Sequence, residues 1–187
     1  NLIAFGSKFL HSKDLVKVLK EMNDKKKFAH LVFYLESCES GSMFKTLLPK
    51  DINVFAVSAS NATQSSYACY FDKKRKTYLG DVFSVMWMQD SDQENLNAET
   101  LQEQFKMTKK KTNTSHVMEW GDEKIQKMTV AEFQGNQQSN HIVYPAPNPN
   151  DDAVPAEDVD MEIIKQMWLS SSDESEKDQL IKQMSDL

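Results

Sequence analysis

One short polar segment, with a cysteine at its centre, carries the residue types best suited to chemistry. Residues 34–43 read YLESCESGSM, and Cys38 follows an apolar run that ends at Leu35. A thiolate is a strong nucleophile, and the N-terminus of a helix after Cys38 would favour the anion. Glu36 would share a face with Cys38 if a strand continues that far, because side chains two apart on a strand point the same way. A carboxylate so close to a thiol suits substrate recognition better than activation of the nucleophile.

The elements that must position Cys38 predict an α/β fold. Apolar residues at helical spacing predict a helix over 13–26, and apolar, β-branched runs predict buried strands over 30–36 and 52–58. A helix over 43–48 would connect the two strands, which puts Cys38 at the carboxyl edge of the sheet, where ligands of such sheets bind. Further helices are expected over 81–88 and 98–110, and further strands over 116–120 and 127–130.

Composition changes near the end of the chain. A domain is expected to end near residue 143, followed by a proline- and asparagine-rich linker and two short helices, with Ser172-Asp173 suited to cap the second. Residues 146–187 carry 11 acids and 3 bases, against 17 acids and 19 bases before them, which gives net charges of −8 and +2. This asymmetry suits an acidic tail lying on the body and argues against nucleic acid as the main partner.

Several segments resemble the legumain family, asparagine-specific cysteine endopeptidases with a caspase-like fold. The segment around Cys38 resembles the family's nucleophile motif. Others follow in the family's order: SSYACY at 65–70, KRKTYLGD at 74–81, WMQDSD at 87–92, TNTSHVM at 112–118 and FQG at 133–135. The resemblance implies that residues 1–143 are the C-terminal part of a three-layer αβα peptidase domain with a mostly parallel central sheet. It implies a linker over 144–155 and a segment over 156–187 like the family's activation peptide and helical prodomain.

The resemblance also assigns roles by position. Cys38 is the nucleophile that forms a thioester, while Glu36, Ser65 and Asp81 belong to the substrate pocket. Carboxylates suit an asparagine side chain because its NH₂ group offers two hydrogen-bond donors, whereas an aspartate would be accepted only where acid neutralises the charge. The alternative for Asp81 is an acid favoured at a helix N-terminus. An amine could capture the thioester in place of water, so peptide ligation is a variant of the same activity.

The family's general base is a histidine in a His-Gly pair, and the sequence holds no such pair. Aligned on Phe5, Leu10 and Lys13, the chain starts a few residues after that position, and a pocket arginine is expected upstream as well. The chain therefore resembles a fragment that would have little activity alone. The second hypothesis is a catalytically inactive or truncated relative that acts as a binding or regulatory module. The histidines present are expected at the surface or in strands: His11, His30, His116 and His141.

Two departures from the family concern subsites and processing. Val82 stands where the family commonly has tryptophan, and Phe83 replaces tyrosine, so substrate subsites are expected to differ. Ser172 stands near the family's self-processing asparagine, which makes Asn150 or Asn140 the better candidate here.

The remaining expectations concern Cys69, modification and partners. Cys69 is a free thiol near the cleft, a core residue or a disulfide partner of Cys38. The sequons at Asn61 and Asn113 fit a secreted or lysosomal protein. The resemblance implies polypeptide substrates, the protein's own prodomain and cystatin-type inhibitors as partners, and no cofactor. No Cys/His cluster has metal-ligand spacing, and no apolar run approaches the length of a transmembrane helix.

Overall fold

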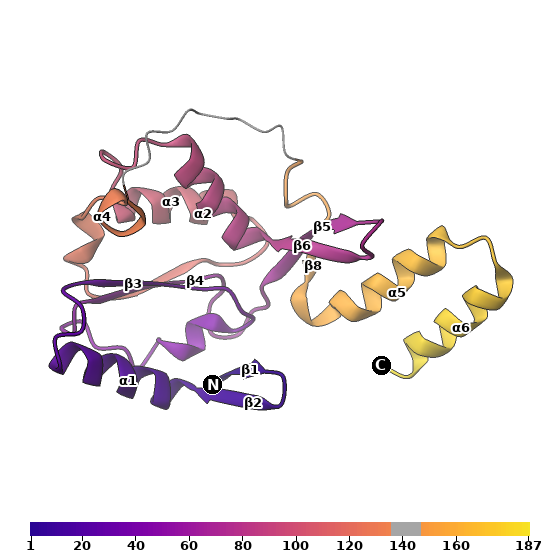
Figure 1. The fold of residues 1–187 in the computed structure, drawn as a ribbon, viewed down its shortest axis with the longest axis horizontal. Helices are drawn as coiled ribbons and strands as arrows, with labels where there is room; N and C mark the ends of the chain where they lie inside the picture. The colour runs from indigo at the N-terminus through magenta and orange to yellow at the C-terminus, as the bar shows by residue number, and fades with distance from the viewer. Residues whose placement is uncertain (136–146) are drawn as a thin grey trace.

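The computed structural model describes residues 1–135 and 147–187, which form a mixed α/β structure with three small sheets (Figure 1). The expected domain end at residue 143, the first part of the linker, Asn140 and His141 lie outside the described residues.

The central sheet has the strand order β3 (Leu31–Leu35), β4 (Val54–Ser58), β7 (Met118–Gly121). β3 and β4 are parallel, and β4 and β7 are antiparallel. All five residues of β4 are buried, while β3 is only partly buried because it lies at one edge. The strands predicted over 30–36, 52–58 and 116–120 are thus confirmed.

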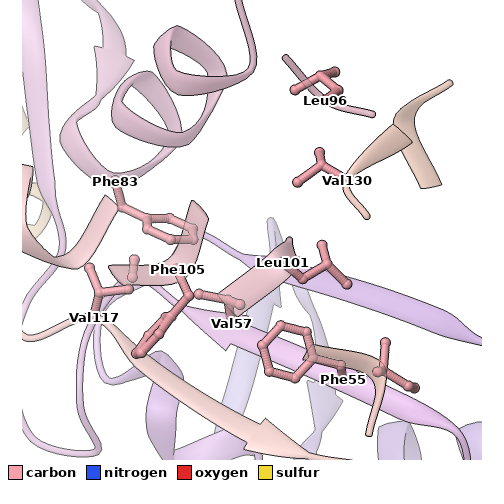
Figure 2. Packing of buried hydrophobic residues seen from close by; sticks show 10 residues of the cluster. Phe55, Val57, Phe83, Leu96, Leu101, Phe105, Val117 and Val130 are labelled. Atoms are coloured by element: carbon pink, nitrogen blue, oxygen red, sulfur yellow. The ribbon is translucent and has the colours of Figure 1, made fainter. Parts of the chain in front are cut away.

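Helices cover both faces of this sheet. Phe55 and Val57 of β4 point to one face and pack against Phe83 of α2 (Val82–Gln93) and Phe105 of α3 (Leu101–Lys111), as Figure 2 shows. Val54, Ala56 and the buried leucines of α1 (Ser12–Asp24) form a second cluster on the opposite face (Figure 1). Each fully buried phenylalanine stabilises the fold by roughly 1.5–3 kcal/mol. The helices predicted over 13–26, 81–88 and 98–110 are confirmed.

Two predicted elements are wrong. The helix expected over 43–48 is absent: Ser40–Met43 form a 3₁₀ helix (η1), and turns follow it. The Ser-Gly-Ser sequence favours turns, and the segment before Pro49 is too short to repay helix nucleation. The strand expected over 127–130 is also absent, because Ile125–Lys127 form a 3₁₀ helix (η2) and Thr129 makes only an isolated bridge to Thr100. A short helix, α4 (Ala131–Gln134), follows.

Two antiparallel hairpins were not predicted. The first joins β1 (Leu2–Phe5) to β2 (Lys8–His11) through a two-residue turn in which Gly6 has φ of 60°. The second joins β5 (Tyr67–Asp72) to β6 (Thr77–Asp81). A two-residue strand from the expected linker, β8 (Val154–Pro155), pairs with the other edge of β5.

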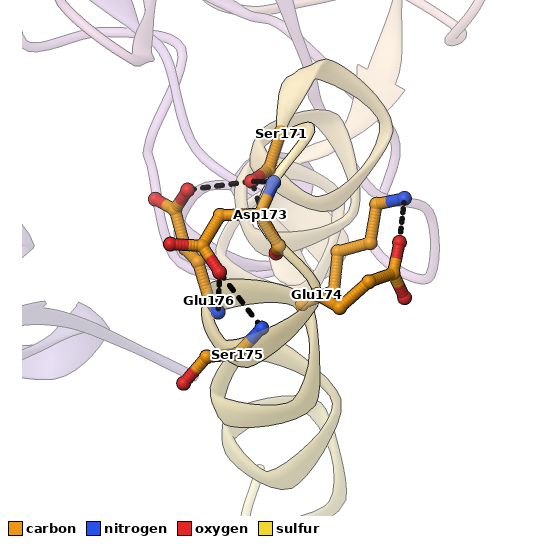
Figure 3. Close-up of polar contacts among 6 residues, drawn as sticks. Ser171, Asp173, Glu174, Ser175 and Glu176 are labelled. Atoms are coloured by element: carbon orange, nitrogen blue, oxygen red, sulfur yellow. Dashed lines mark hydrogen bonds and ion pairs between the residues drawn. The ribbon is translucent and has the colours of Figure 1, made fainter.

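The tail forms the helices expected of it. A 3₁₀ turn, η3 (Ala156–Asp158), leads into α5 (Val159–Ser170), and α6 (Glu174–Ser185) packs back on α5. Asp173 caps α6, since its carboxylate accepts hydrogen bonds from the N–H groups of Ser175 and Glu176 (Figure 3). None of the helices in the described ranges combines the length and apolarity that a membrane span requires.

Candidate functional site

Cys38 lies three residues beyond the end of β3, as a partly exposed free thiol. Its Sγ is 3.7 Å from Oγ of Ser66, which precedes β5. Because β3 ends at Leu35, the alternation expected to align Glu36 with Cys38 does not reach either residue. The two side chains are instead tied to different elements, Cys38 to the loop before β5 and Glu36 to the start of α2.

The turn that contains Cys38 and Glu39, called the Cys38 turn below, is hydrogen-bonded to the loop at 59–66, called the serine loop. The Glu39 N–H donates to the Gln64 carbonyl at 2.7 Å, and the Gly41 N–H donates to the Ser60 carbonyl at 3.1 Å. Glu39 adopts a left-handed conformation with φ of 50°. A β-carbon added to Gly41 would lie 2.8 Å from the backbone carbon of Asn61, so the turn needs glycine for this close approach. The Cys38 turn and the serine loop therefore form one unit.

Glu36 is held by the N-terminus of α2. Its Oε2 accepts a hydrogen bond of 2.8 Å from the Ser84 N–H, while its Oε1 is buried and has no hydrogen-bond partner. Burial and then the nearby Asp81 carboxylate raise the pKa of Glu36 to about 7, against a lowering by Ser84. An unpaired buried carboxylate oxygen is costly, and a bound donor would relieve that cost.

Asp81 is the N-cap residue of α2, but its side chain does not cap the helix. A capping side chain at position 81 would normally accept a hydrogen bond from the Ser84 N–H, but Glu36 accepts it instead. Burial raises the pKa of Asp81. The alternative expected for Asp81, an acid favoured by the helix dipole, also fits this position.

Ser65 is half-buried between two residues tied to the Cys38 turn: Gln64 through its carbonyl, and Ser66 through its hydroxyl. Sequence reasoning selected Ser65 and missed Ser66 and Ser84. The adjacent serines Ser65 and Ser66 precede an apolar stretch, and this pattern could have identified Ser66. Ser84 gave no signal, because its role depends on where α2 begins.

Cys69 and Val82 belong to the core beneath the site. Cys69 is fully buried and free, so the disulfide alternative is wrong, and it packs with Val82, Val85 and Met86. Burial, followed by the charge of Asp152, raises the pKa of its thiol to about 12, which makes it a poor nucleophile. Phe83 is buried in the cluster of Figure 2.

His11, His30 and His116 are exposed, as expected of surface residues. His116 is hydrogen-bonded through Nδ1 to Oε1 of Gln64, at 2.8 Å. Among the sequon asparagines, Asn113 is exposed, whereas Asn61 is half-buried and accepts from Thr63. No group of three or more potential metal ligands occurs within residues 1–135 and 147–187.

Comparison with known proteins gives a consistent result over most of the chain. The sequence profile of the Peptidase C13 family matches residues 1–136. Mouse legumain is 46% identical over 185 residues, which are 98% of this chain and 42% of the relative. The hemoglobinase of Schistosoma japonicum is 35% identical over 97% of this chain and 43% of its own length.

A plant relative, the vacuolar-processing enzyme of Vicia sativa, is 43% identical over 143 residues, 71% of this chain and 29% of its own length. The chain thus spans less than half the length of the curated relatives it matches. The matched family region contains the Cys38 turn, the serine loop, Glu36 and Asp81, and the chain belongs to the Peptidase C13 family.

Proposed function

We propose that this chain is part of a cysteine endopeptidase that cleaves peptides after asparagine through a thioester on Cys38. The observation that carries the proposal is the hydrogen bonding of two acids near the end of β3, Glu36 and Asp81. Glu36 keeps one buried oxygen without a partner, and Asp81 does not cap its own helix. Both carboxylates are therefore free to accept hydrogen bonds from the NH₂ group of an asparagine side chain. The resemblance to the legumain family adds Ser65, which is half-buried next to Ser66, as a polar wall of this pocket.

The pocket's selectivity follows from charge. An ionised aspartate would meet Glu36 and Asp81 as like charges, so it should bind only when acid removes charge from the pocket or from the substrate. The raised pKa of both acids supports this, since their neutral forms persist to higher pH than in free residues. Asparagine is therefore the preferred residue, with aspartate accepted under acid conditions.

The general base is expected to be a histidine in a segment that precedes Asn1 in the longer protein, with a pocket arginine from the same region. Asn1 supports this placement, because its side-chain Nδ2 donates to the carbonyl of Ser42, four residues after the nucleophile. A chain continuing before Asn1 would start beside the Cys38 turn. A base is needed because the thiolate, and not the thiol, is the nucleophile.

The segment around β8 acts as an intramolecular ligand of the same site. The Ala156 N–H donates to the Ser66 carbonyl at 2.9 Å, and β8 pairs with Tyr67 and Ala68. Substrate peptides commonly add as a strand to an open sheet edge, so β8 would compete for this edge. Residues 156–187 then correspond to the start of a prodomain, and the acidic tail would loosen from the body as its carboxylates are protonated.

Two other activities would use the same pocket. Capture of the Cys38 thioester by an amine would make the protein a ligase with the same pocket. A catalytically inactive binding module would bind asparagine side chains in the same pocket without turnover.

The remaining expectations follow the family. The complete domain would extend the central sheet beyond the open edge of β3 into a caspase-like, three-layer αβα fold with mostly parallel strands, and it would end near residue 143. A lysosomal or secreted location, N-glycans at Asn61 and Asn113, and inhibition by cystatin-type proteins accompany this proposal. Self-processing at Asn150 would need local opening, because its side-chain Nδ2 donates to the carbonyl of Lys111.

Kinetics of the full-length, acid-activated protein test the proposal. Peptides that differ only in asparagine, aspartate or glutamine at the cleavage position should be cleaved with a strong preference for asparagine at pH 8, where Glu36 is ionised, and Cys38→Ser should abolish turnover. Cys69→Ser is the matched control and should retain activity. A protein that processes all three peptides alike, or that keeps activity without Cys38, would refute the proposed function.

A further inference from the structure

Ser66 carries a buried hydroxyl that contacts the proposed nucleophile. Its Oγ lies 3.7 Å from Sγ of Cys38, within hydrogen-bonding range for sulfur, and either atom could be the donor. Ser66 is only 3% exposed, so bulk water does not replace this contact. Within residues 1–135 and 147–187, neither the hydroxyl nor Sγ makes another hydrogen bond. In this part of the chain, each of the two groups is therefore the polar partner of the other.

The segments on either side of Ser66 are held in place. Strand β5 begins at the next residue and pairs with β6 from Ala68 onward. Two positions before Ser66, the Gln64 carbonyl accepts a hydrogen bond of 2.7 Å from the N–H of Glu39, the residue after Cys38. The hydroxyl and the sulfur thus lie on segments that are tied together beside their contact. A donor fixed in this way can stabilise a charge without reorganising when the charge forms.

Nearby buried serines use their hydroxyls differently. Ser58 donates to the carbonyl of Ser60 at 2.9 Å. Ser115 donates to the carbonyl of Ala59 at 2.7 Å. These two hydroxyls satisfy backbone groups, whereas the Ser66 hydroxyl satisfies none and reaches a sulfur atom instead. A neutral thiol is a weak hydrogen-bond partner and a thiolate is a strong acceptor, so this contact gains most of its strength when the thiol ionises.

We propose that Ser66 is a catalytic residue: its hydroxyl donates a hydrogen bond to the thiolate of Cys38 and so favours the ionised, attacking form of the nucleophile. The general base takes the thiol proton, and Ser66 keeps its own. The sulfur electron pair then forms the S–C bond while the electron pair of the C=O bond moves to the carbonyl oxygen. This inference rests on the proposed function for its substrate, but the contact with the thiolate can be measured without a substrate.

Alkylation of Cys38 by iodoacetamide tests the contact in the full-length, acid-activated protein, with the adduct assigned by mass spectrometry. Ser66→Ala should lower the rate at pH 6 about three- to tenfold, because the thiolate loses a charge-assisted hydrogen bond and regains only part of this loss as higher nucleophilicity. Ser66→Thr keeps the hydroxyl and should react at close to the wild-type rate. Ser66→Val has the shape of threonine without the hydroxyl and should react as slowly as Ser66→Ala.

Turnover of an asparagine peptide separates this role from a structural one. Loss of the Ser66 hydroxyl should lower kcat by a similar factor and leave KM nearly unchanged, because the hydroxyl contacts the sulfur and not the substrate side chain. A displaced substrate pocket would instead raise KM, and Ser66→Thr would not restore the wild-type value. That second pattern would overturn the catalytic role of Ser66.

Ser115→Ala is the matched control, because it removes a hydroxyl that donates to the serine loop without reaching Sγ. It should leave the alkylation rate and kcat close to wild type. Equal alkylation rates in wild type, Ser66→Ala and Ser66→Val would overturn the role of Ser66 and leave the proposed function intact. A wild-type enzyme with no preference for asparagine would refute the proposed function, and the alkylation rates would still show whether the hydroxyl stabilises the thiolate. If Ser66→Ala does not fold, the comparison of Ser66→Thr with Ser66→Val decides the question.

Discussion

At the scale of single residues, the two cysteines have opposite surroundings. Cys38 is partly exposed in a polar turn beside Ser66, whereas Cys69 is enclosed by apolar side chains and has a strongly raised pKa. A thiol must be accessible and able to ionise to act as a nucleophile. Only Cys38 meets the first requirement, which is why the proposed reaction uses it.

Gly41 gives a residue-scale prediction. Gly41→Ala should force the Cys38 turn away from Asn61 and lower the catalytic activity of the full-length enzyme at least about tenfold, because a displacement of about 1 Å in a site can cost a factor of about a hundred. Peptide kinetics measure the activity, and urea unfolding measures the stability.

Gly6→Ala is the control for the Gly41 variant. Gly6 needs its positive φ, but no atom lies within 4 Å of an added β-carbon. This substitution should strain the β1–β2 turn without changing catalysis. Full activity in Gly41→Ala would show that the close contact with Asn61 does not position Cys38.

The motifs selected Cys38, Glu36, Ser65 and Asp81, but not the contacts that hold these residues. In the structure Cys38 lies beside Ser66, and Glu36 lies at the start of α2 near Asp81. That Glu36, and not Asp81, satisfies the Ser84 N–H could not be read from the sequence. The contact joins residues 48 positions apart and depends on how α2 packs against the end of β3.

At the scale of elements, the predictions succeeded where periodicity was long and failed where elements were short. The apolar face of α1 and the fully buried β4 were found from their patterns. The β5–β6 hairpin was missed because Tyr70 interrupts strand alternation with φ of 62°, and β8 because it has only two residues. Such elements form through tertiary contacts that local sequence does not specify.

The junction of α2 and α3 contains a pH-sensitive acid pair. Asp90 is 1% exposed, and its carboxyl group shares a side-chain hydrogen bond with that of Glu99. Burial, then Asp90, raises the pKa of Glu99 to about 8, and burial raises that of Asp90. These acids hold protons in the folded state that they lose on unfolding. The free energy of unfolding is therefore highest below about pH 4 and falls as pH rises toward 8.

Glu99→Gln should therefore stabilise the protein at pH 8.5, on the order of 1–2 kcal/mol, and have little effect at pH 4. Urea unfolding across this range measures the difference. Glu103→Gln on α3 should behave in the opposite sense, since hydrogen bonds from Thr100 lower the pKa of Glu103 and its contribution is lost as pH falls. A pH-independent effect of Glu99→Gln would contradict the account of the acid pair.

The contact of the tail with β5 gives a second element-scale prediction. Asp152 accepts hydrogen bonds from the N–H groups of Tyr70 and Phe71, at 2.9 and 2.7 Å, and so holds β8 near the serine loop. Asp152→Asn weakens these bonds because it removes the charge that strengthens them. Cys38 in the full-length protein before acid treatment should then react about three- to tenfold faster with a peptide-based thiol reagent, a loss of about 0.7–1.4 kcal/mol from the contact.

Asp151→Asn is the neighbouring control, since no side-chain hydrogen bond of Asp151 is seen among the described residues, and it should leave the labelling rate unchanged. Equal rates in wild type and Asp152→Asn would show that the β8 contact does not limit access to Cys38.

At the scale of the whole molecule, the chain combines a helix-covered sheet with an acidic tail, and the tail's strand β8 pairs with β5. Helices lie on both faces of the central sheet (Figure 1). The end of β3 leads into the Cys38 turn. Strand β8 then brings residues 154–156 to the serine loop, more than a hundred positions after Cys38. The Cys38 turn, the loop at 59–66 and β8 therefore meet at the start of β5.

The most direct measurement is covalent labelling of the full-length, acid-activated protein with a peptide that carries asparagine next to a thiol-reactive group, followed by peptide mass spectrometry. The account predicts a single adduct, on Cys38, formed much faster with asparagine than with glutamine, and slowed by Glu36→Ala and by Asp81→Ala. Labelling of Cys69 at a comparable rate, or a rate on Cys38 that ignores the side chain of the peptide, would contradict it.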